Sequence, residues 1–522
     1  MSTLTLGIIV IIYMFVIAWL GYLGYRQTKN ASDYLLGGRK VNPIIMALSY
    51  GATFISASAI VGFGGVAATF GMGIQWLCLL NMFMGVVVAF IFFGRRTRKL
   101  GEAHNARTFP QLLGLHYKSR SIQIFIASII FIGMPLYAAV VMKGGAVFIE
   151  QMFHIDLHLA LLIFTLIVAA YVITGGIKGV LYTDALQAVI MFACMLFLLF
   201  WFYHIMDMGF IEANQKLTDI APMVRFKALG HQGWTAMPIS GSPQWYTLVT
   251  SLILGVGIGC LAQPQLVVRF MMVESTKQLN RGVLIGCVFL IVTVGAIYHV
   301  GALSNLFFLK TEGVVASEAV KDMDKIIPQG KELGVYLYNK AMPEWFGAVF
   351  MLCILSASMS TLSAQFHTMG AAFGADAFPK LGRSKNPNST LGVRIGVLCS
   401  ILVSYVICYT LSASIIARGT ALFMGICAAT FLPTYFCSLY WKGATRQGAL
   451  ASLWVGGLAS LCAMLFLHKA EAAPVGLCKA LFGQDVLIDV YPWHAIDPIL
   501  FALPLSAITI VLVSLATQKK AF

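Results

Sequence analysis

Long uninterrupted apolar stretches are the feature that most limits what this chain can fold into. Many of them exceed the roughly 18 residues that a helix needs to cross a lipid bilayer. With 59% hydrophobic and 11% charged residues, the chain is too apolar for a soluble protein of its length. Spans this long favour helices over the shorter strands of a membrane barrel. The sequence therefore predicts an all-α integral membrane protein. We count about thirteen transmembrane helices, at residues 5–25, 43–70, 74–94, 121–149, 157–174, 179–206, 245–268, 282–304, 345–372, 392–413, 417–440, 447–468 and 497–517.

The net charge of +15 is explained by where the basic residues fall between these stretches. Lys and Arg gather in alternate loops, among them "GRRTRK", "HYKSR" and "PKLGRSK", whereas acids balance them in the other loops. Because cytoplasmic loops of membrane proteins are rich in Lys and Arg, this pattern predicts an outside N-terminus and a cytoplasmic C-terminus. We expect a multi-pass protein of the plasma (cytoplasmic) membrane that is embedded in the lipid bilayer and does not bind nucleic acid.

The segments between the stretches are too short for a nucleotide-binding or catalytic domain, the longest being about 207–243 and 305–343. No "GxxxxGK" phosphate loop occurs, and the 11 cysteines show no metal-ligand or disulfide spacing. We therefore expect no enzymatic activity and no cofactor, and an ion gradient as the energy source of any transport. The run "EAVKDMDKII" at 318–327 predicts a surface helix.

Two spans are interrupted by glycine or proline. The span 43–70 contains the run "GFGG", and the span 245–268 contains "GVGIG" followed by Pro264. Small residues of this kind serve tight helix packing, but two interrupted spans five helices apart are also typical of an inverted-repeat transporter. The prediction is a single transporter domain over 1–522 with a LeuT-type repeat of five helices. Its parts are an extra helix at 5–25, a first repeat at 43–206, a second repeat at 245–440, and two C-terminal helices with a tail at 441–522.

Charged residues inside spans mark functional sites by default, and we place Lys143 and Asp184 clearly within them. Asp184 follows a glycine turn, so it is either a carboxylate stabilised at a helix N-terminus or part of an ion path. Lys143 either reaches toward the headgroups or supplies a counter-charge to a substrate carboxylate or to Asp184. His367 is a lone histidine, which we interpret as a packed or pore-lining side chain.

The ninth span holds "SASMSTLSAQ", with five hydroxyl side chains at residues 356–365. Three elements of the chain resemble the sodium:solute symporter family: the "GG...TDxxQ" element that contains Asp184, "GxGxxxxPQxxxRF" at 257–270, and the run "MSTLS" at 359–363. The resemblance covers about residues 5–440. "GATFISASAIVGFGG" in the second span is more similar to the pantothenate and monocarboxylate branch than to the sugar or proline branches.

The resemblance implies a sodium site between the second and ninth helices. By the family's pattern, its ligands are the backbone carbonyls of Ala52, Ile55 and Ala357 and the hydroxyls of Ser360 and Thr361. A broken helix facing a hydroxyl-rich one is a physically reasonable source of oxygens for a hard cation.

Some relatives, such as the sialic acid symporters, hold a second sodium, and this chain resembles them there at Asp184 and Ser363. Ala364 removes one hydroxyl of that site. We therefore expect one sodium rather than two, with Asp184 and Ser363 forming a partial second site or a sodium release path.

The family's substrate site lies between helices 2, 3, 4, 7 and 8, which makes the candidates here Ser56, Ser58, Asn81, Lys143, Gln263 and Tyr298. The aromatic residues of proline symporters correspond to Val256 and Cys260, and the glutamate of sugar symporters corresponds to Cys78. These differences disfavour proline and sugars.

The sequence predicts a sodium-coupled symporter that works as a monomer and imports a small organic solute by alternating access. The expected solute is a carboxylate such as a monocarboxylate or pantothenate. Proton-coupled transport of an amino acid or sugar, and nutrient sensing with a separate kinase, remain alternatives.

Overall fold

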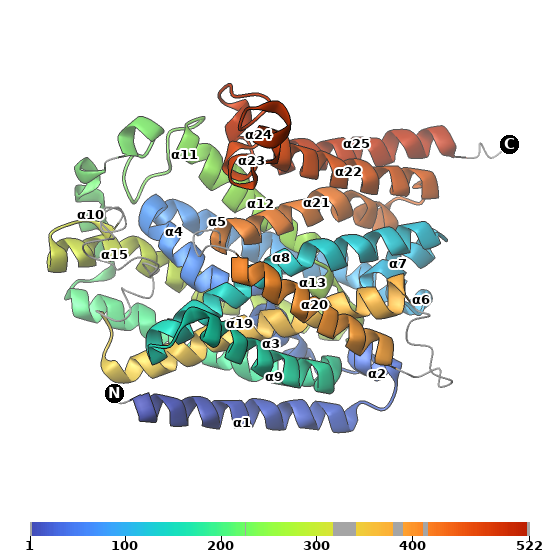
Figure 1. Ribbon diagram of the computed structural model, residues 1–522, viewed down its shortest axis with the longest axis horizontal. Coiled ribbons are helices and arrows are strands. Elements are labelled where there is room, and N and C mark those ends of the chain that lie inside the picture. The colour runs from blue at the N-terminus through green and yellow to red at the C-terminus, as the bar shows by residue number, and fades with distance from the viewer. Residues whose placement is uncertain (1–2, 225, 317–340, 379–389, 411–415, 519–522) are drawn as a thin grey trace.

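The computed structural model describes residues 3–224, 226–316, 341–378, 390–410 and 416–518. Over these residues the chain forms helices and no strand, and the long helices run roughly along the longest axis of the molecule (Figure 1). Helix α1 (Thr3–Gln27) lies along one edge, while α22 (Arg446–Phe466) and α25 (Ile499–Thr517) lie at the opposite edge. The start of α1 and the end of α25 are at opposite ends of the bundle, as the predicted topology requires.

Eleven helices of the described chain are long and apolar enough to cross a membrane. Two shorter apolar helices, Pro43–Phe54 and Leu157–Ile173, lie in the predicted spans 43–70 and 157–174. The all-helical membrane class is therefore confirmed, and every predicted span contains a helix. The number of crossings, about thirteen, stays a prediction, as do the bounds of the two repeats.

The second span is broken in its middle. Helix α3 (Pro43–Phe54) begins at Asn42, whose side chain accepts a hydrogen bond from the amide of Ile44 at 2.9 Å. The helix stops at Ile55, which has an extended conformation (φ −95°, ψ 111°). A new helical segment starts at Ser58 and continues as α4 (Phe63–Phe70). The break leaves carbonyls of the last turn of α3 without partners inside the helix.

The seventh span is broken in a similar way. It consists of η7 (Tyr246–Leu254), α12 (Gly255–Gly259) and η8 (Cys260–Ala262), and it is interrupted at Gln263 (φ −69°, ψ 115°). Pro264 follows, and two short segments, α13 (Pro264–Val267) and η9 (Val268–Met271), complete the span. Both interruptions predicted from the glycine pattern are thus present.

Helix α9 (Leu157–Met206) covers the predicted spans 157–174 and 179–206 and bends sharply between them. The bend lies at Gly176, which has φ 57° and ψ −166°. A Cβ there would lie 2.7 Å from the ring of Tyr34. The position therefore requires glycine both for its backbone conformation and for the space that it leaves.

Helix α19 (Glu344–Ala371) is the most enclosed of the eleven candidate spans. It packs against α3, α8, α9 and α20, so its hydroxyl side chains face other helices rather than lipid. The remaining long helical segments are α5 (Gln75–Met82) with η4 (Phe83–Gly94) and α6 (Arg95–Ala103), α8 (Arg120–Phe153), α14 (Thr276–Leu290) with η10 (Ile291–Gly295) and α15 (Ala296–Glu312), α20 (Leu391–Thr410) and α21 (Ile416–Tyr440).

Short helices cover the two ends of the bundle. At the end where α1 begins, α10 (Phe210–Asp219) lies on the surface, whereas α7 (Phe109–His116) lies at the other end. The run 318–327, predicted to be a surface helix, lies outside the described residues.

Candidate functional site

Ser360 of α19 lies against the broken end of α3. Its hydroxyl donates to the carbonyl oxygen of Ala52 at 2.9 Å and to that of Ala357, one turn earlier in its own helix, at 3.2 Å. Both the hydroxyl and the two carbonyls are buried. The Ser360 hydroxyl is thus within hydrogen-bonding distance of two carbonyl oxygens that the family resemblance assigns, like the hydroxyl itself, to sodium.

Thr361 completes this cluster from the next position of α19. Its hydroxyl lies 3.1 Å from the carbonyl oxygen of Thr53 and 3.4 Å from that of Ile55. These carbonyls are available because α3 ends at Phe54 and offers its last turn no further amide donors. A hydroxyl can rotate its hydrogen away and present lone pairs, so the same oxygens can surround a cation.

The structure therefore brings all five predicted sodium ligands together, and it adds the carbonyl of Thr53, which the sequence analysis missed. The signal was available, because Thr53 belongs to the same last helical turn as Ala52. A hard cation such as sodium prefers oxygen ligands of this kind, and a broken helix facing a second helix is where membrane transporters bind one.

Asp184 of α9 lies in a second polar cluster directly beside the first. Its Oδ2 accepts hydrogen bonds from the hydroxyls of Ser49 at 2.7 Å and Thr53 at 3.2 Å, and its Oδ1 accepts one from Ser363 at 3.3 Å. Ser363 also lies 3.0 Å from the carbonyl oxygen of Ser360. The predicted proximity of Asp184 and Ser363 is thus present, and Thr53 contributes to both clusters.

Arg269 is the main feature that the sequence analysis missed. Its Nη2 lies 3.0 Å from Oδ2 of Asp184, and 1% and 0% of the two side chains are exposed. The guanidinium also donates to the hydroxyl of Thr53 at 2.5 Å, to Ser49 at 3.1 Å and to the carbonyl of Gln265 at 2.6 Å. The expectation that Lys143 and Asp184 are the clearly intramembrane charges is therefore incomplete.

The signal for Arg269 lay in the sequence. It is the arginine of "PQxxxRF", one residue beyond the predicted end of the span 245–268. The predicted span ends at residue 268 and so leaves Arg269 just outside the membrane. In the structure the chain turns after the break, and Arg269 points inward toward α3 and α9. The counter-charge of Asp184 in this structure is Arg269 and not Lys143.

Lys143 of α8 lies apart from the Asp184 cluster. It is buried, with 6% of the residue exposed, and its charge lies near the thiol of Cys408 in α20. The neighbouring Gly144 faces Ala57 at the break of the second span, where an added Cβ would meet Ala57 at 3.1 Å. The backbone of α8 therefore approaches the break closely.

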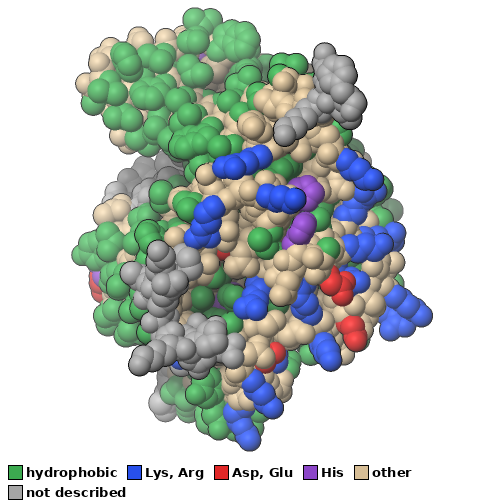
Figure 2. Space-filling view, turned by 90° about the vertical axis from the view of Figure 1, so that its right-hand side faces the viewer, with side chains coloured by type: hydrophobic (Ala, Val, Ile, Leu, Met, Phe, Trp, Pro, Cys, Tyr) green, Lys and Arg blue, Asp and Glu red, His purple; other side chains and the backbone are tan. Residues whose placement is uncertain are grey.

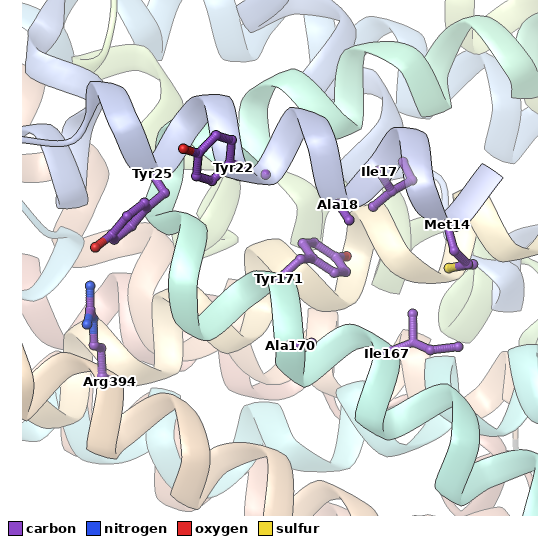
Figure 3. Close-up of a pocket in the computed structure, with 10 residues that line it drawn as sticks. Met14, Ile17, Ala18, Tyr22, Tyr25, Ile167, Ala170, Tyr171 and Arg394 are labelled. Atoms are coloured by element: carbon purple, nitrogen blue, oxygen red, sulfur yellow. The ribbon is translucent and has the colours of Figure 1, made fainter. Parts of the chain in front are cut away.

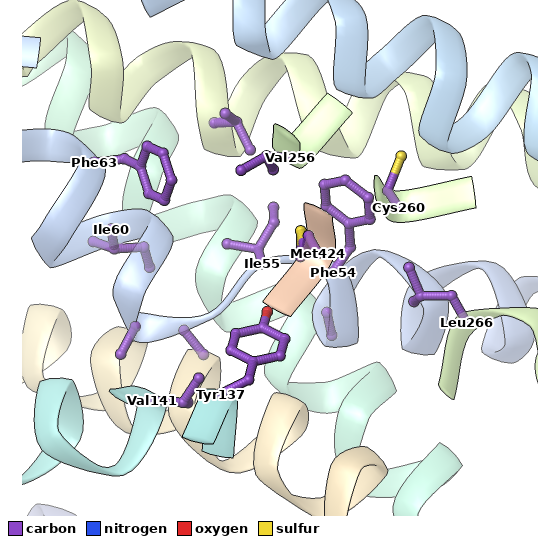
Figure 4. Packing of buried hydrophobic residues seen from close by; sticks show 14 of the residues in the cluster. Phe54, Ile55, Ile60, Phe63, Tyr137, Val141, Val256, Cys260, Leu266 and Met424 are labelled. Carbon is purple, nitrogen blue, oxygen red and sulfur yellow. The ribbon is translucent and has the colours of Figure 1, made fainter. Parts of the chain in front are cut away.

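Ser56 and Ser58 form the turn between the two halves of the second span. Their hydroxyls are hydrogen-bonded to each other, and the hydroxyl of Thr420 in α21 lies 2.8 Å from that of Ser58. Tyr137 of α8 reaches the same turn with its hydroxyl on Ser56. Figure 4 shows Tyr137 pointing toward the extended segment at Ile55. These two substrate candidates are thus brought together.

The other substrate candidates besides Lys143 are Asn81, Gln263 and Tyr298, on helices other than the broken second span. Gln263 and Asn81 are buried, and neither Nε2 of Gln263 nor Oδ1 of Asn81 has a hydrogen-bond partner among the described residues. The ring of Tyr298 packs 6.3 Å from that of Phe63. Apolar side chains line the space around the break (Figure 4), among them Phe54, Ile60, Val141, Val256, Cys260, Leu266 and Met424.

His367 has a packing role in this structure. Its Nε2 lies 2.9 Å from the carbonyl oxygen of Tyr34, and the two rings are 5.5 Å apart. In the described part of the chain, no group of three or more His, Cys, Asp and Glu side chains is arranged to hold a metal ion.

Comparisons with known proteins give the family of this chain. The model of the sodium:solute symporter family matches residues 34–456. The high-affinity proline transporter PutP of Bacillus subtilis is 28% identical over 444 residues, which cover 84% of this chain and 87% of that protein. Sodium/proline symporter 2 of Staphylococcus saprophyticus is 27% identical, covering 92% of this chain and 89% of the relative.

The fold is similar to that of a Na⁺-coupled sialic acid symporter solved in a substrate-bound outward-open state. The TM-score is 0.73 at 17% identity, and the match covers 98% of this chain and 96% of the other. These relatives are transporters and not enzymes. The two relatives found by sequence are proline symporters, so they do not support the expected similarity to the pantothenate and monocarboxylate branch. The chain belongs to the sodium:solute symporter family.

Proposed function

We propose that this protein is a sodium-coupled symporter that binds sodium at the junction of α3 and α19 and imports a small solute with a carboxylate. The observation that carries the proposal is the contact of the Ser360 and Thr361 hydroxyls with the carbonyls of Ala52, Thr53 and Ile55. These oxygens are buried, belong to a broken helix, and converge from two separate elements. Membership of a family of sodium symporters supports sodium as the coupling ion.

Binding of sodium at this junction connects α3 to α19 through several oxygens at once. In an alternating-access cycle, that connection stabilises one arrangement of the two helices and shapes the turn at Ser56 and Ser58, where the solute binds. Low sodium on the other side of the membrane then releases the ion and the solute.

The charge balance around Asp184 favours one sodium ion per cycle. A buried carboxylate requires a positive partner, and here Arg269 provides one at 3.0 Å. Ala364 stands where a further hydroxyl of a second site would be. Asp184 and Ser363 therefore serve the release path of the bound sodium rather than a second permanent site.

The solute is proposed to bind near Ser56, Ser58 and Gln263. The orphaned Nε2 of Gln263 is a buried hydrogen-bond donor, which suits a carboxylate oxygen. Lys143 is buried and precedes Gly144, whose added Cβ would lie 3.1 Å from Ala57 between Ser56 and Ser58. Because the two sequence relatives are named as proline transporters, a proline-like amino acid is the first solute to test. By the family resemblance, however, Val256 and Cys260 stand where proline symporters have aromatic side chains.

The orientation in the membrane is proposed from the charge of the two ends. Figure 2 shows that Lys and Arg side chains gather on the end of the bundle where α6 and α7 lie, with few acids among them. A basic end of this kind faces the cytoplasm in multi-pass membrane proteins. The N-terminus then lies outside and the C-terminus inside, in the cell membrane.

Uptake into proteoliposomes tests the proposal. Proline, other amino acids, pantothenate, short monocarboxylates and sialic acid are supplied with an inward sodium gradient, with an equal potassium gradient, or with a proton gradient in sodium-free buffer. We expect one carboxylate solute to accumulate with sodium alone. Accumulation that persists without sodium and collapses with a protonophore would instead establish proton coupling.

A further inference from the structure

A groove with a volume of about 590 Å³ lies between α1, α9 and the beginning of α20 (Figure 3). Its long part is lined by Met14, Ile17 and Ala18 of α1 and by Ile167 of α9, all of them apolar. Helix α1 lies at the edge of the bundle and exposes further large apolar side chains on its outer face. In a membrane this groove is therefore open to lipid acyl chains.

The chemistry changes at one end of the groove. Arg394 of α20 lies there with Tyr22 and Tyr25 of α1. Figure 3 shows the guanidinium of Arg394 pointing toward Tyr25, while Met14 and Ile167 lie at the far end. The groove thus combines a long apolar slot with one polar, positively charged end.

Arg394 has an incompletely satisfied charge. Its Nε is buried and has no hydrogen-bond partner among the described residues, and no carboxylate of those residues forms an ion pair with it. The guanidinium carbon lies 5.7 Å from the ring of Tyr34, a weak cation–π contact, and the guanidinium also hydrogen-bonds the neutral Tyr34 hydroxyl. A positive charge at the edge of the hydrocarbon requires an anionic partner, and the planar guanidinium fits a phosphate with two hydrogen bonds.

The depth of Arg394 in the membrane agrees with a lipid headgroup. The groove end that contains it lies at the same end of α1 as Arg26 and Lys29, which are exposed. Tyrosine side chains such as Tyr22 and Tyr25 are characteristic of the membrane interface. Helix α1 lines the groove from its polar end to its apolar slot. A phospholipid with its phosphate at the interface could therefore lay an acyl chain along this helix.

We propose that this groove binds one anionic phospholipid, with its phosphate held by Arg394 and Tyr25 and one acyl chain lying against Met14, Ile17 and Ile167. The site is separate from the sodium site, so the binding itself does not depend on the proposed function. It touches the transport helices, however. Tyr171 lines the groove, and its hydroxyl donates to the carbonyl oxygen of Met359, next to Ser360, at 2.8 Å.

Lipid binding is tested with the whole protein purified in mild detergent and mixed with phosphatidylglycerol or phosphatidylcholine, with bound lipid counted by native mass spectrometry. We expect the protein to retain one phosphatidylglycerol molecule. Arg394→Gln should weaken the binding of this lipid at least tenfold. Arg446→Gln is the matched control, because Arg446 is exposed at the start of α22 and lies outside the groove. Arg394→Lys retains the charge and should retain part of the preference.

A second variant tests the acyl slot independently of charge. Ala18→Phe fills the slot from the exposed face of α1 and should reduce lipid retention while leaving the size-exclusion profile unchanged. Equal phosphatidylglycerol retention in Arg394→Gln and Arg446→Gln would overturn the proposal. Equal retention of both lipids by the unaltered protein would overturn it as well, as would full competition by free glycerophosphate, which would indicate a headgroup site without an acyl slot.

Discussion

The guanidinium of Arg269 and the carboxylate of Asp184 form a buried ion pair at 3.0 Å, and both also bond the hydroxyl of Thr53. The carbonyl of the same Thr53 accepts a hydrogen bond from Thr361 of the proposed sodium site. One residue at the end of α3 therefore connects the charged pair to the candidate cation site. We therefore expect a change in either cluster to affect the other through Thr53.

Arg269→Gln should destabilise the protein by roughly 3–5 kcal/mol, because it leaves the Asp184 carboxylate buried without its positive partner. Unfolding in detergent, followed by tryptophan fluorescence against temperature or denaturant, measures the loss. The double variant Arg269→Gln with Asp184→Asn removes both charges and should recover part of it. A single variant as stable as the unaltered protein would contradict the assigned pairing.

Ser360→Ala and Thr361→Ala should each raise the sodium concentration for half-maximal uptake by about tenfold or more, since each removes one oxygen from a small ligand set. Initial rates of uptake against sodium concentration give this value. Ser358→Ala is the matched control in the same helix, because the Ser358 hydroxyl bonds the carbonyl of Ile354 in its own helix, at 2.9 Å. If all three variants changed this sodium concentration equally, sodium would not bind at this junction.

Uptake by the unaltered protein should rise with sodium with a Hill coefficient near 1, because Arg269 neutralises Asp184 and Ala364 offers no hydroxyl for a second ion. The ratio of sodium to solute, obtained from the reversal potential of uptake in vesicles of known membrane voltage, should likewise be one. A ratio of two would show that the ion pair opens to admit a second sodium during transport.

Much of the candidate sodium site could be predicted because the family resemblance implies its ligands. The resemblance pairs the broken end of α3 with α19, although Ala52 and Ser360 lie 308 residues apart. Spacing alone groups only Ser360 and Thr361, which belong to one turn of α19. The glycine and proline pattern likewise predicted both helix breaks, which occur at Ile55 and at Gln263.

The ion pair was not predicted, because no pattern in the sequence indicates that Arg269 and Asp184 are in contact. Arg269 occupies a position at the edge of a hydropathy window, and its burial depends on the direction that the chain takes after the break at Gln263. The contact between Tyr13 of α1 and Ser356 of α19, at 3.0 Å, is hidden for the same reason.

The solute was the least predictable part. The candidates Ser56, Ser58 and Gln263 are polar positions in a largely apolar region, and many solutes with one carboxylate satisfy them. Discrimination between such solutes depends on the shape of apolar walls such as Phe54 and Val256, and shape depends on packing across several helices rather than on any local pattern.

The close contact between α1 and α9 gives the last prediction. A Cβ on Gly24 would lie 2.2 Å from the backbone nitrogen of Gly179, so the two helices touch through their main chains. Gly24→Ala should force them apart and cost about 1–3 kcal/mol, the usual range for overpacking. Gly7→Ala in the same helix is the matched control, because no atom lies within 4 Å of its added Cβ. Thermal unfolding in detergent should show a lower midpoint for Gly24→Ala than for Gly7→Ala, and equal midpoints would mean that α1 does not pack against α9 as described.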